Sequence, residues 1–193
     1  MKIESIVLVG KFVRLEPLSM NHLNGLAEVA FEDSIWKLNP IIISNDEKLR
    51  QYVETALDEK ERGISLPFAT IEKSSNKVIG STRFGNIDVK NRRVEIGWTW
   101  IHPNWQRSAI NTEAKFLMLR HAFEIWNCIR VELKTDVLNE KSRNAILRIG
   151  AKQEGIFRHP VVCETGRIRD TIYFSVLDSE WQEVKNNLAS KLF

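Results

Sequence analysis

The sequence predicts an α/β fold in which a mixed, mostly antiparallel central sheet is flanked by helices. Residues 65–102 contain three strand-like segments with alternating apolar and polar side chains, separated by short polar turns. Helical patterns with apolar faces precede and follow these strands. The chain has 193 residues, 43% of them hydrophobic, which suits one well-buried domain better than two. We therefore expect a single domain over residues 1–193, with a core of about 12–177.

The first elements are a strand, a helix and an apolar loop. Residues 12–18 form a short strand pattern, and Ser19 is placed to cap a helix that runs to Ala30. The following stretch, residues 36–43 (WKLNPIII), is a loop because it contains an Asn-Pro pair. A solvated loop is seldom so apolar, so Trp36 and the isoleucines either plug the core or line a pocket.

A second helix is predicted after this loop. Ser44 and Glu47 have the spacing of a capping box. The helical pattern continues to about Arg62, and Gly63 is placed to end it.

The three central strands are expected to form an antiparallel meander. Their segments are residues 65–73, 77–88 and 92–102, and the turn at 75–76 is typical of a hairpin. In the third segment apolar residues alternate from Val94 to Trp100, and Gly97, which stands between two of them, weakens the strand. A glycine inside a strand marks a bulge or the close approach of another molecule.

A strongly apolar helix is predicted over residues 112–126, packed on the sheet. Its polar residues form one expected stripe: Glu113, Arg120, Glu124 and Asn127. Residues 130–138 follow as a strand. Asn139 then caps a short helix that Gly150 ends.

The last third of the chain contains two long strands and a helix. The strands cover residues 152–162 and 167–177. The helix covers residues 179–192, and Ser179 with Gln182 has the spacing of a capping box. The resulting order of strands and helices is typical of an α/β protein with a mixed sheet.

Composition excludes several classes of function. The 28 basic and 25 acidic residues give a formal charge of +3, too balanced for a general nucleic-acid-binding surface but compatible with a small polyanionic ligand. Charged residues interrupt the apolar N-terminal stretch, so we expect neither a signal peptide nor a membrane span, and a cytoplasmic protein. Cys128, Cys163 and the four histidines lack metal-ligand spacing. We expect packed or idle thiols and no metal.

The turn before the 112–126 helix is a candidate anion site. Residues 101–116 (IHPNWQRSAINTEAKF) lead from a strand through a basic, polar turn without glycine into the helix. A helix start presents unpaired N–H groups and the positive end of the helix dipole. The dipole contributes at most about 2 kcal/mol, so several N–H bonds and Arg107 would have to supply most of the binding. An ordinary turn capped by Ser108 or Asn111 would show the same pattern.

The turn also resembles a known cofactor-binding motif. Residues 101–114 resemble the CoA-binding signature of the GNAT superfamily of N-acetyltransferases, Q/R-x-x-G-x-G/A, with Gln106, Ala109 and Asn111 at its three defined positions. The stretches EIGWTWIHP and TDVLNEKSRNAILRIGA resemble the RimJ/RimL-like branch, which contains ribosomal-protein N-terminal acetyltransferases. The order of elements is similar to the GNAT fold over residues 12–177.

The two replaced glycines affect the expected strength of binding. Asn tolerates a left-handed backbone well, so Asn111 is a mild change. Ala109 would be strained by about 1 kcal/mol if its φ were positive, which lowers affinity without removing a site built from N–H donors.

The resemblance implies a co-substrate site for acetyl-CoA. The thioester would lie in a wedge between strands 93–102 and 130–138, where a backbone N–H near Ile101 polarises its carbonyl. The pyrophosphate would bind the amides from Arg107 to Thr112, and Ser142 would protonate the departing thiolate. The implied cofactor-binding residues are Trp100, Ile101, Gln106, Arg107, Ser108, Ala109, Ile110, Asn111, Thr112 and Asn139.

The acceptor is expected to be a primary amine, most simply a protein or peptide α-amine. An α-amine has a pKa of about 7.7–8.0, so much of it is neutral near pH 7.5, whereas a lysine is almost wholly protonated. Glu95 can accept the proton through water, and a glutamate on a solvated strand face explains it equally well. The resemblance places Trp36 and His159 on the acceptor side.

Three classes of function remain open on the sequence. The first is an enzyme that acetylates a ribosomal or other protein N-terminus, with a small-molecule acetyltransferase for an antibiotic or a polyamine as its variant. The second is a catalytically silent CoA-binding module, and the third is a nucleic-acid or ribosome-associated adaptor. The RimJ/RimL-like branch also implies a possible homodimer. We expect no membrane partner and no direct nucleic-acid binding.

Overall fold

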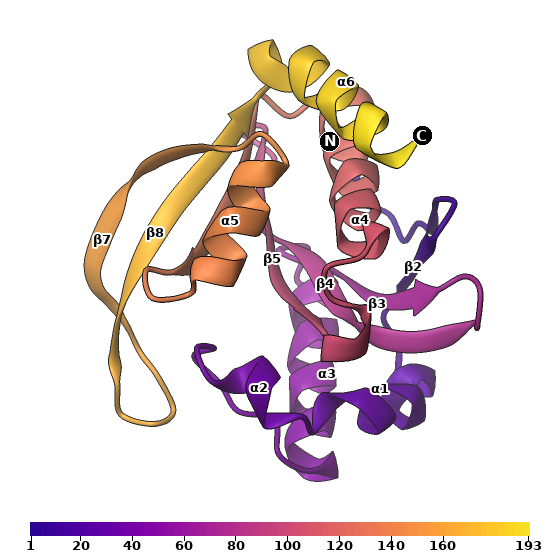
Figure 1. The fold of residues 1–193 in the computed structure, drawn as a ribbon, viewed down its shortest axis with the longest axis vertical. Coiled ribbons are helices and arrows are strands. Elements are labelled where there is room, and N and C mark those ends of the chain that lie inside the picture. Colours follow the sequence, from indigo (N-terminus) through magenta and orange to yellow (C-terminus); the bar gives the residue numbers. More distant parts are fainter.

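The computed structural model describes all residues from Met1 to Phe193 and contains one eight-stranded sheet (Figure 1). The strand order across the sheet is β1-β2-β3-β4-β5-β6-β8-β7. The strands are β1 (Leu8–Val9), β2 (Val13–Pro17), β3 (Leu66–Glu72), β4 (Lys77–Asp88), β5 (Arg93–Ile101), β6 (Arg130–Asp136), β7 (Lys152–Val162) and β8 (Ile168–Leu177). All neighbours are antiparallel except β5 and β6. The predicted mixed, mostly antiparallel sheet is confirmed.

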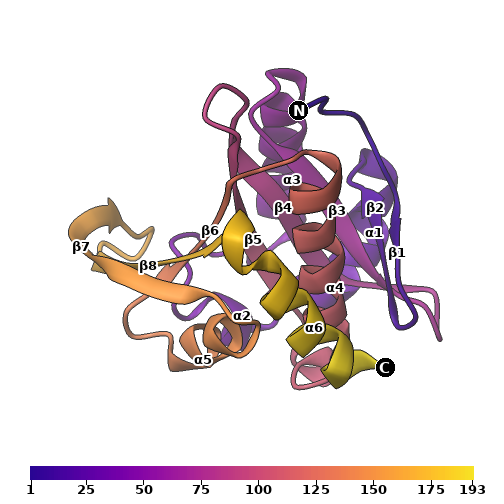
Figure 2. The same cartoon turned by 90° about the horizontal axis from the view of Figure 1, so that it is seen from above.

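Helices cover both faces of this sheet. They are α1 (Leu23–Ala30), α2 (Asp33–Trp36), α3 (Asp46–Glu61), α4 (Ala109–Arg120), α5 (Glu140–Arg148) and α6 (Trp181–Leu192), with short turns η1 (Met20–His22), η2 (Pro103–Trp105), η3 (His121–Ile125) and η4 (Asp178–Glu180). Helices α1 and α3 pack on β3 and β4, and α4 lies on the opposite face beside α6 (Figure 2). Each layer has its own buried apolar cluster. No helix combines the length and apolar character needed to cross a membrane.

Several predicted helix ends are confirmed and two are wrong. Gly63 and Gly150 follow α3 and α5 with positive φ, as a helix stop requires. The cap of α3 is Asn45, whose Oδ1 accepts from Lys48 N–H at 2.9 Å, so the predicted Ser44 cap is one residue early. At the last helix the Leu177 N–H donates to Glu180 Oε2, which replaces the predicted Ser179 and Gln182 box.

Helix α4 begins three residues earlier than predicted, and one residue of its expected polar stripe is buried. Its N-cap is Ser108, and its last turn continues into the π-helical segment η3. Glu113 is fully buried, which contradicts its placement in a solvated stripe. The carboxylate is buried because the N-terminal segment folds over it.

Glu113 anchors the turn that joins β1 to β2. Its Oε1 accepts from Lys11 N–H at 2.7 Å, and its Oε2 accepts from Phe12 and Val13 N–H at 2.7 and 2.9 Å. A Cβ atom on Gly10 would lie 2.3 Å from the carboxylate carbon, so only glycine leaves room for this contact. The buried charge is thus stabilised by three charge-assisted bonds from the main chain.

Strand β7 forms one free edge of the sheet and is exposed over most of its length. Its pairing with β8 changes register twice, near Gly155 and again between Phe157 and Val161. His159, inside the second irregularity, has a φ of 55°. Figure 2 shows the β7–β8 hairpin projecting from the helix-covered part of the sheet.

Replacing Glu113 with glutamine should destabilise the fold by about 1–3 kcal/mol, because an amide N–H₂ would face main-chain N–H donors. Urea denaturation of the variant and the wild type measures this difference. The control is Glu54→Gln on the exposed face of α3, which should change stability by less than about 0.5 kcal/mol. Equal effects at both positions would contradict the anchoring role.

Candidate active site

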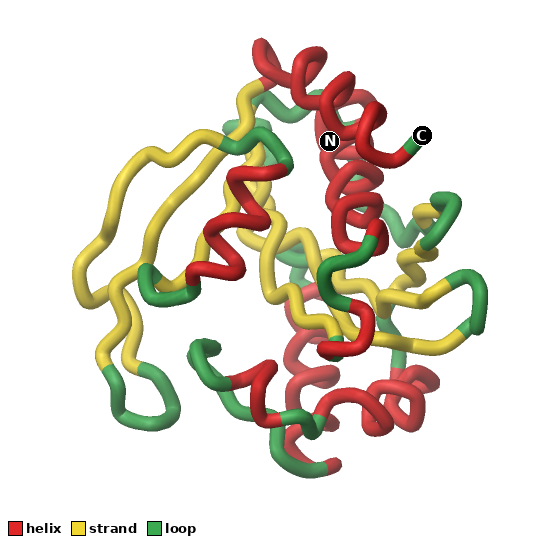
Figure 3. The backbone as a smooth tube through the Cα atoms, viewed as in Figure 1, coloured by secondary structure: helices red, strands yellow, loops and turns green.

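The two central strands part just after they begin to pair. Strands β5 and β6 share only three parallel pairs: Arg93 with Arg130, Val94 with Val131, and Glu95 with Glu132. Beyond them β5 continues to Ile101, paired only with β4, while β6 continues to Asp136, paired only with β8. We call the opening between residues 96–101 and 133–136 the wedge; the diverging strands are visible in Figure 3. It lies between the strands that the sequence resemblance indicated.

A turn at the open end of β5 delivers the N-terminus of α4. Ser108 caps the helix, and its Oγ accepts from Ile110 N–H at 3.3 Å. The positive φ of the turn, 57°, falls on Arg107. Ala109 and Asn111 lie inside the helix, and neither has a positive φ. The expected strain at Ala109 is therefore absent, and the turn keeps its shape without the two motif glycines.

Gln106 and Asn111 have different roles in this turn. The Gln106 side chain turns back and donates from Nε2 to Ile101 O at 2.8 Å, which ties the turn to the end of β5. The Asn111 Oδ1 is buried and has no hydrogen-bond partner. Trp100 is also buried, and its Nε1 has no partner.

Helix α5 starts at the open end of β6, as α4 does at the open end of β5. Asn139 caps it, with Oδ1 accepting from Ser142 N–H at 3.0 Å, so the predicted cap is confirmed. The Ser142 side chain is half-buried, and its hydroxyl has no partner in the structure. Arg148 Nη2 donates to Thr112 Oγ1 at 3.1 Å, which links α5 to the first turn of α4.

Glu95 lies at the closed end of the wedge. It is only 7% exposed, so its interpretation as a residue on a solvated strand face is wrong. Its Oε2 accepts from Asn86 Nδ2 at 2.7 Å and from Lys134 Nζ at 2.8 Å. Its Oε1 accepts no hydrogen bond, and a Cβ on Gly97 would lie 3.0 Å from it. The glycine inside this strand therefore leaves space beside the carboxylate.

The two predicted acceptor-side residues are placed differently. Trp36 is buried and packs on Trp100 with ring centroids 5.4 Å apart, so it plugs the core. The loop after it does reach the β7–β8 hairpin: Glu164 N–H donates to Pro40 O, and Glu164 Oε2 accepts from Ile42 N–H at 2.7 Å. His159 lies on that hairpin with an exposed side chain.

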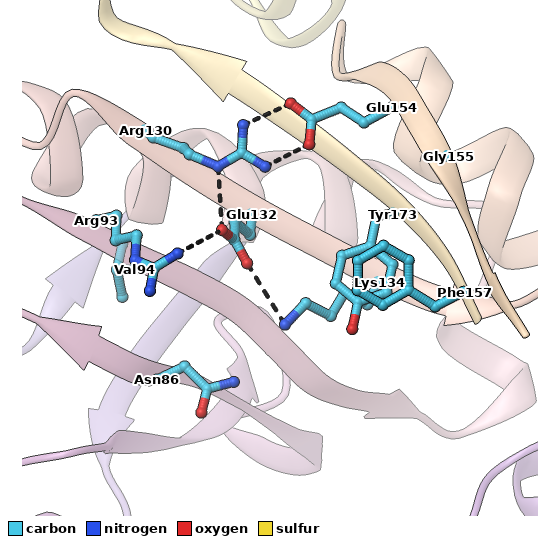
Figure 4. Close-up of a pocket in the computed structure, with 10 residues that line it drawn as sticks. All are labelled: Asn86, Arg93, Val94, Arg130, Glu132, Lys134, Glu154, Gly155, Phe157 and Tyr173. Carbon is cyan, nitrogen blue, oxygen red and sulfur yellow. Dashed lines mark hydrogen bonds and ion pairs between the residues drawn. The ribbon is translucent and has the colours of Figure 1, made fainter. Parts of the chain in front are cut away.

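A cleft of about 580 Å³ opens on the sheet beside the closed end of the wedge (Figure 4). We call it the charged cleft; it is lined by Asn86, Arg93, Val94, Arg130, Glu132, Lys134, Glu154, Gly155, Phe157 and Tyr173. Arg130 bonds both Glu132 and Glu154, and the close Glu154 pair lowers the pKa of that carboxyl to about 2 against the opposing effect of burial. The charged side chains that line the cleft are therefore largely paired with one another.

The sequence did not reveal two lysines near the wedge. Lys134 lies within the predicted strand 130–138, where nothing in the sequence pattern singled it out. Lys115 is 6% exposed on α4, and its Nζ bonds Thr99 Oγ1 at 2.6 Å and Thr82 Oγ1 at 3.1 Å. Its burial lowers the pKa of Lys115 to about 7. The only available sign was a lysine between Ala114 and Phe116, within the apolar part of the helix.

Comparisons with known proteins agree with this geometry. A family model described as acetyltransferase (GNAT) domain matches residues 13–152. A Bacillus subtilis (strain 168) protein, named as a candidate ribosomal N-acetyltransferase, YdaF, is 36% identical over 106 residues, covering 55% of this chain and 57% of that protein. The chain therefore matches little more than half the length of that relative.

Two solved structures are similar over almost the whole chain. A GCN5-related N-acetyltransferase from Brucella melitensis has a TM-score of 0.92 and 32% identity, covering 100% of this chain and 88% of its own. Mycobacterium smegmatis RimJ, in complex with CoA-disulfide, has a TM-score of 0.79 and 20% identity, covering 97% of this chain and 92% of its own. The second likeness concerns the fold alone.

Replacing Lys115 with methionine should change how stability depends on pH. Unfolding raises the pKa of this lysine from about 7 to about 10.4, so the unfolded chain binds more protons between these values. The wild type should therefore gain stability as pH rises from 7 to 9, by at most about 1.4 kcal/mol per unit from this group, and Lys115→Met should lack that gain.

Urea denaturation at pH 7, 8 and 9 measures the slope. The matched control is Lys90→Met in the exposed turn between β4 and β5, which should keep the slope of the wild type. Parallel curves for the wild type and Lys115→Met would show that the buried lysine does not titrate in this range.

Proposed function

The chain belongs to the GNAT acetyltransferase family, and we propose that it transfers the acetyl group of acetyl-CoA to the α-amine of a protein or peptide. Acetyl-CoA-dependent N-acetylation is the general activity that the family supports. The similarity to YdaF supports the RimJ/RimL-like branch. The ribosomal acceptor in that relative's name makes a protein N-terminus our first choice of acceptor.

The wedge is the observation that carries this proposal. Past Glu95 and Glu132 the facing edges of β5 and β6 have no strand partner, so their main-chain N–H and C=O groups are free to bind a ligand. The amide-containing arm of CoA has the donors and acceptors that such edges need. At the open end, the N–H groups in the first turn of α4 that have no helical partner and the guanidinium of Arg107 can hold a diphosphate, although Ser108 already accepts from the Ile110 N–H.

We assign the chemical roles from this placement. The neutral amine attacks the thioester carbonyl carbon, a C–N bond forms, and the C–S bond breaks to release CoA thiolate. A backbone N–H near Ile101 stabilises the oxyanion, and Ser142 supplies a proton to the thiolate. Glu95 receives the amine proton through water, because its Oε1 is free and lies beside Gly97 at the edge of the wedge.

A panel experiment tests the proposal. The purified protein is mixed with acetyl-CoA and with peptides that carry a free α-amine, their N-terminally blocked forms, polyamines or aminoglycosides, and thiol release is followed. We expect turnover with the free peptides only. Turnover with the polyamines or aminoglycosides alone would show that the acceptor is a small-molecule amine and not a peptide α-amine. CoA binding measured by calorimetry, without turnover of any amine, would identify a silent CoA-binding module.

Ser142→Ala should lower kcat at least about tenfold with little change in the KM for acetyl-CoA, because the hydroxyl acts only when the thiolate departs. Steady-state kinetics on the best peptide from the panel measure both parameters. Ser179→Ala, which removes a hydroxyl far from the wedge, should behave as the wild type. An unchanged kcat in Ser142→Ala would remove Ser142 from the mechanism.

Arg107→Ala should raise the Kd for CoA about three- to tenfold at low salt and by less at 0.5 M salt, because the exposed guanidinium acts through a screened charge. Calorimetry at both salt concentrations measures the change. Arg107→Gly should lose the same affinity yet be more stable than Arg107→Ala by about 1 kcal/mol, because glycine accepts the φ of 57° without strain. Arg62→Ala, at the exposed residue that follows α3, is the charge-matched control.

A further inference from the structure

An internal ammonium group is bound where the wedge closes. Lys134 Nζ lies 2.8 Å from Glu95 Oε2 and 3.4 Å from Glu132 Oε2. It also lies 4.8 Å from the centroid of the Tyr173 ring (Figure 4). The Lys134 side chain is 19% exposed and faces the charged cleft. This ammonium is thus held by two carboxylates and an aromatic ring beside open space.

Other side chains hold in place the two carboxylates that bind this ammonium. Asn86 Nδ2 donates to the same Oε2 of Glu95 at 2.7 Å. Glu132 is fixed on its other oxygen by Arg130, at 3.0 Å, and by Arg93, at 3.6 Å. Only Glu95 Oε1 is left without a partner, and it lies over Gly97. Glu95 Oε2 can therefore hold an ammonium group while Oε1 stays free to receive a proton.

Lys134 is a cation rather than a neutral amine in this position. Burial lowers its pKa, but hydrogen bonding and attraction to Glu95 outweigh this effect, and the pKa lies above its ordinary value. Carboxylates combined with an aromatic face form a general recognition site for organic ammonium groups. The surroundings of Lys134 Nζ are consequently those that the ammonium of an acceptor would require.

We propose that Lys134 occupies the subsite that receives the ammonium group of the amine acceptor, and that the acceptor displaces it. This inference rests on the proposed function and specifies the acceptor subsite as Glu95, Glu132 and the face of Tyr173. The displaced Lys134 side chain moves away from Glu95 within the charged cleft that it already lines, whose volume of about 580 Å³ leaves room for it. The ammonium then passes a proton through water to Glu95 Oε1, and the neutral amine attacks from beside Gly97.

The proposal predicts competition within one molecule. An acceptor can enter only when Lys134 has left, so its apparent Kd exceeds its intrinsic Kd by the inverse of the fraction of open subsite. Lys134→Met keeps a side chain of similar length against Tyr173 and removes the competing charge. It should therefore bind an ammonium-bearing ligand more tightly.

The experiment measures binding of a short peptide with a free α-amine to the CoA-loaded protein by calorimetry. We expect Lys134→Met to lower its Kd about three- to tenfold. The N-terminally acetylated peptide should show no such gain. Lys90→Met, which removes a lysine from the exposed β4–β5 turn, controls for the change in net charge and should bind as the wild type does.

The opposite result has a clear meaning. Equal or weaker binding of the free peptide by Lys134→Met overturns the proposal and leaves Lys134 as a clamp that joins β5 to β6. If Lys134→Met does not fold, the wild type is tested by NMR of its ¹⁵N-labelled lysine ammonium groups. A shift of the Lys134 signal with the free but not the blocked peptide supports displacement, and no difference between the peptides overturns it.

These outcomes are separable from those of the proposed function. If the wild type is active and Lys134→Met does not bind the free peptide more tightly, the proposed subsite is wrong and the acetyltransferase activity still holds. If the wild type acetylates none of the amines and Lys134→Met binds the free peptide more tightly, the proposed activity is wrong and the ammonium subsite still holds. In an active enzyme, Lys134→Met should lower the KM of the amine and leave the KM of acetyl-CoA unchanged, a split that general destabilisation would not produce.

Discussion

The site depends on one interruption in an otherwise continuous sheet. Interior strands normally pair their main-chain groups on both sides, because an unpaired buried N–H or C=O is costly. Between β5 and β6 only three pairs form, and both strands then continue with one side unpaired. The proposed co-substrate site follows from the separation of these two strands. The separation leaves their facing edges free, and helices α4 and α5 begin beyond the separated ends of β5 and β6.

Buried charges at the wedge and at the N-terminal edge of the sheet show how the protein maintains its shape. Glu113 holds the N-terminal turn through three main-chain N–H groups. Lys115 binds hydroxyls of β4 and β5 close to Trp98, whose φ of 48° marks the bulge where the pairing of those strands shifts. The Glu95–Lys134 pair joins β5 to β6 at the last paired position. Polar side chains thus secure the places where the regular ladder fails.

Local patterns predicted most of the fold because they depend on near neighbours. Strand alternation, the Asn139 cap and the glycines after α3 and α5 all act within a few residues, and each is confirmed. Ser44 failed as a cap because the adjacent Asn45 offers the same chemistry one residue later. In the candidate site, the motif placed the turn correctly but could not show that Arg107 rather than Ala109 takes the positive φ.

Side chains whose partners are distant in sequence could not be predicted in this way. Glu113 meets residues about one hundred positions away, and Glu95 meets Lys134 across 39 positions. Their burial follows from tertiary packing, which a helical or strand period does not encode. A final consequence concerns the free edge of β7. Its two register shifts and the positive φ of His159 interrupt the straight, regular template that another chain would need for pairing, so this long exposed edge is a poor partner for fibril-like self-association.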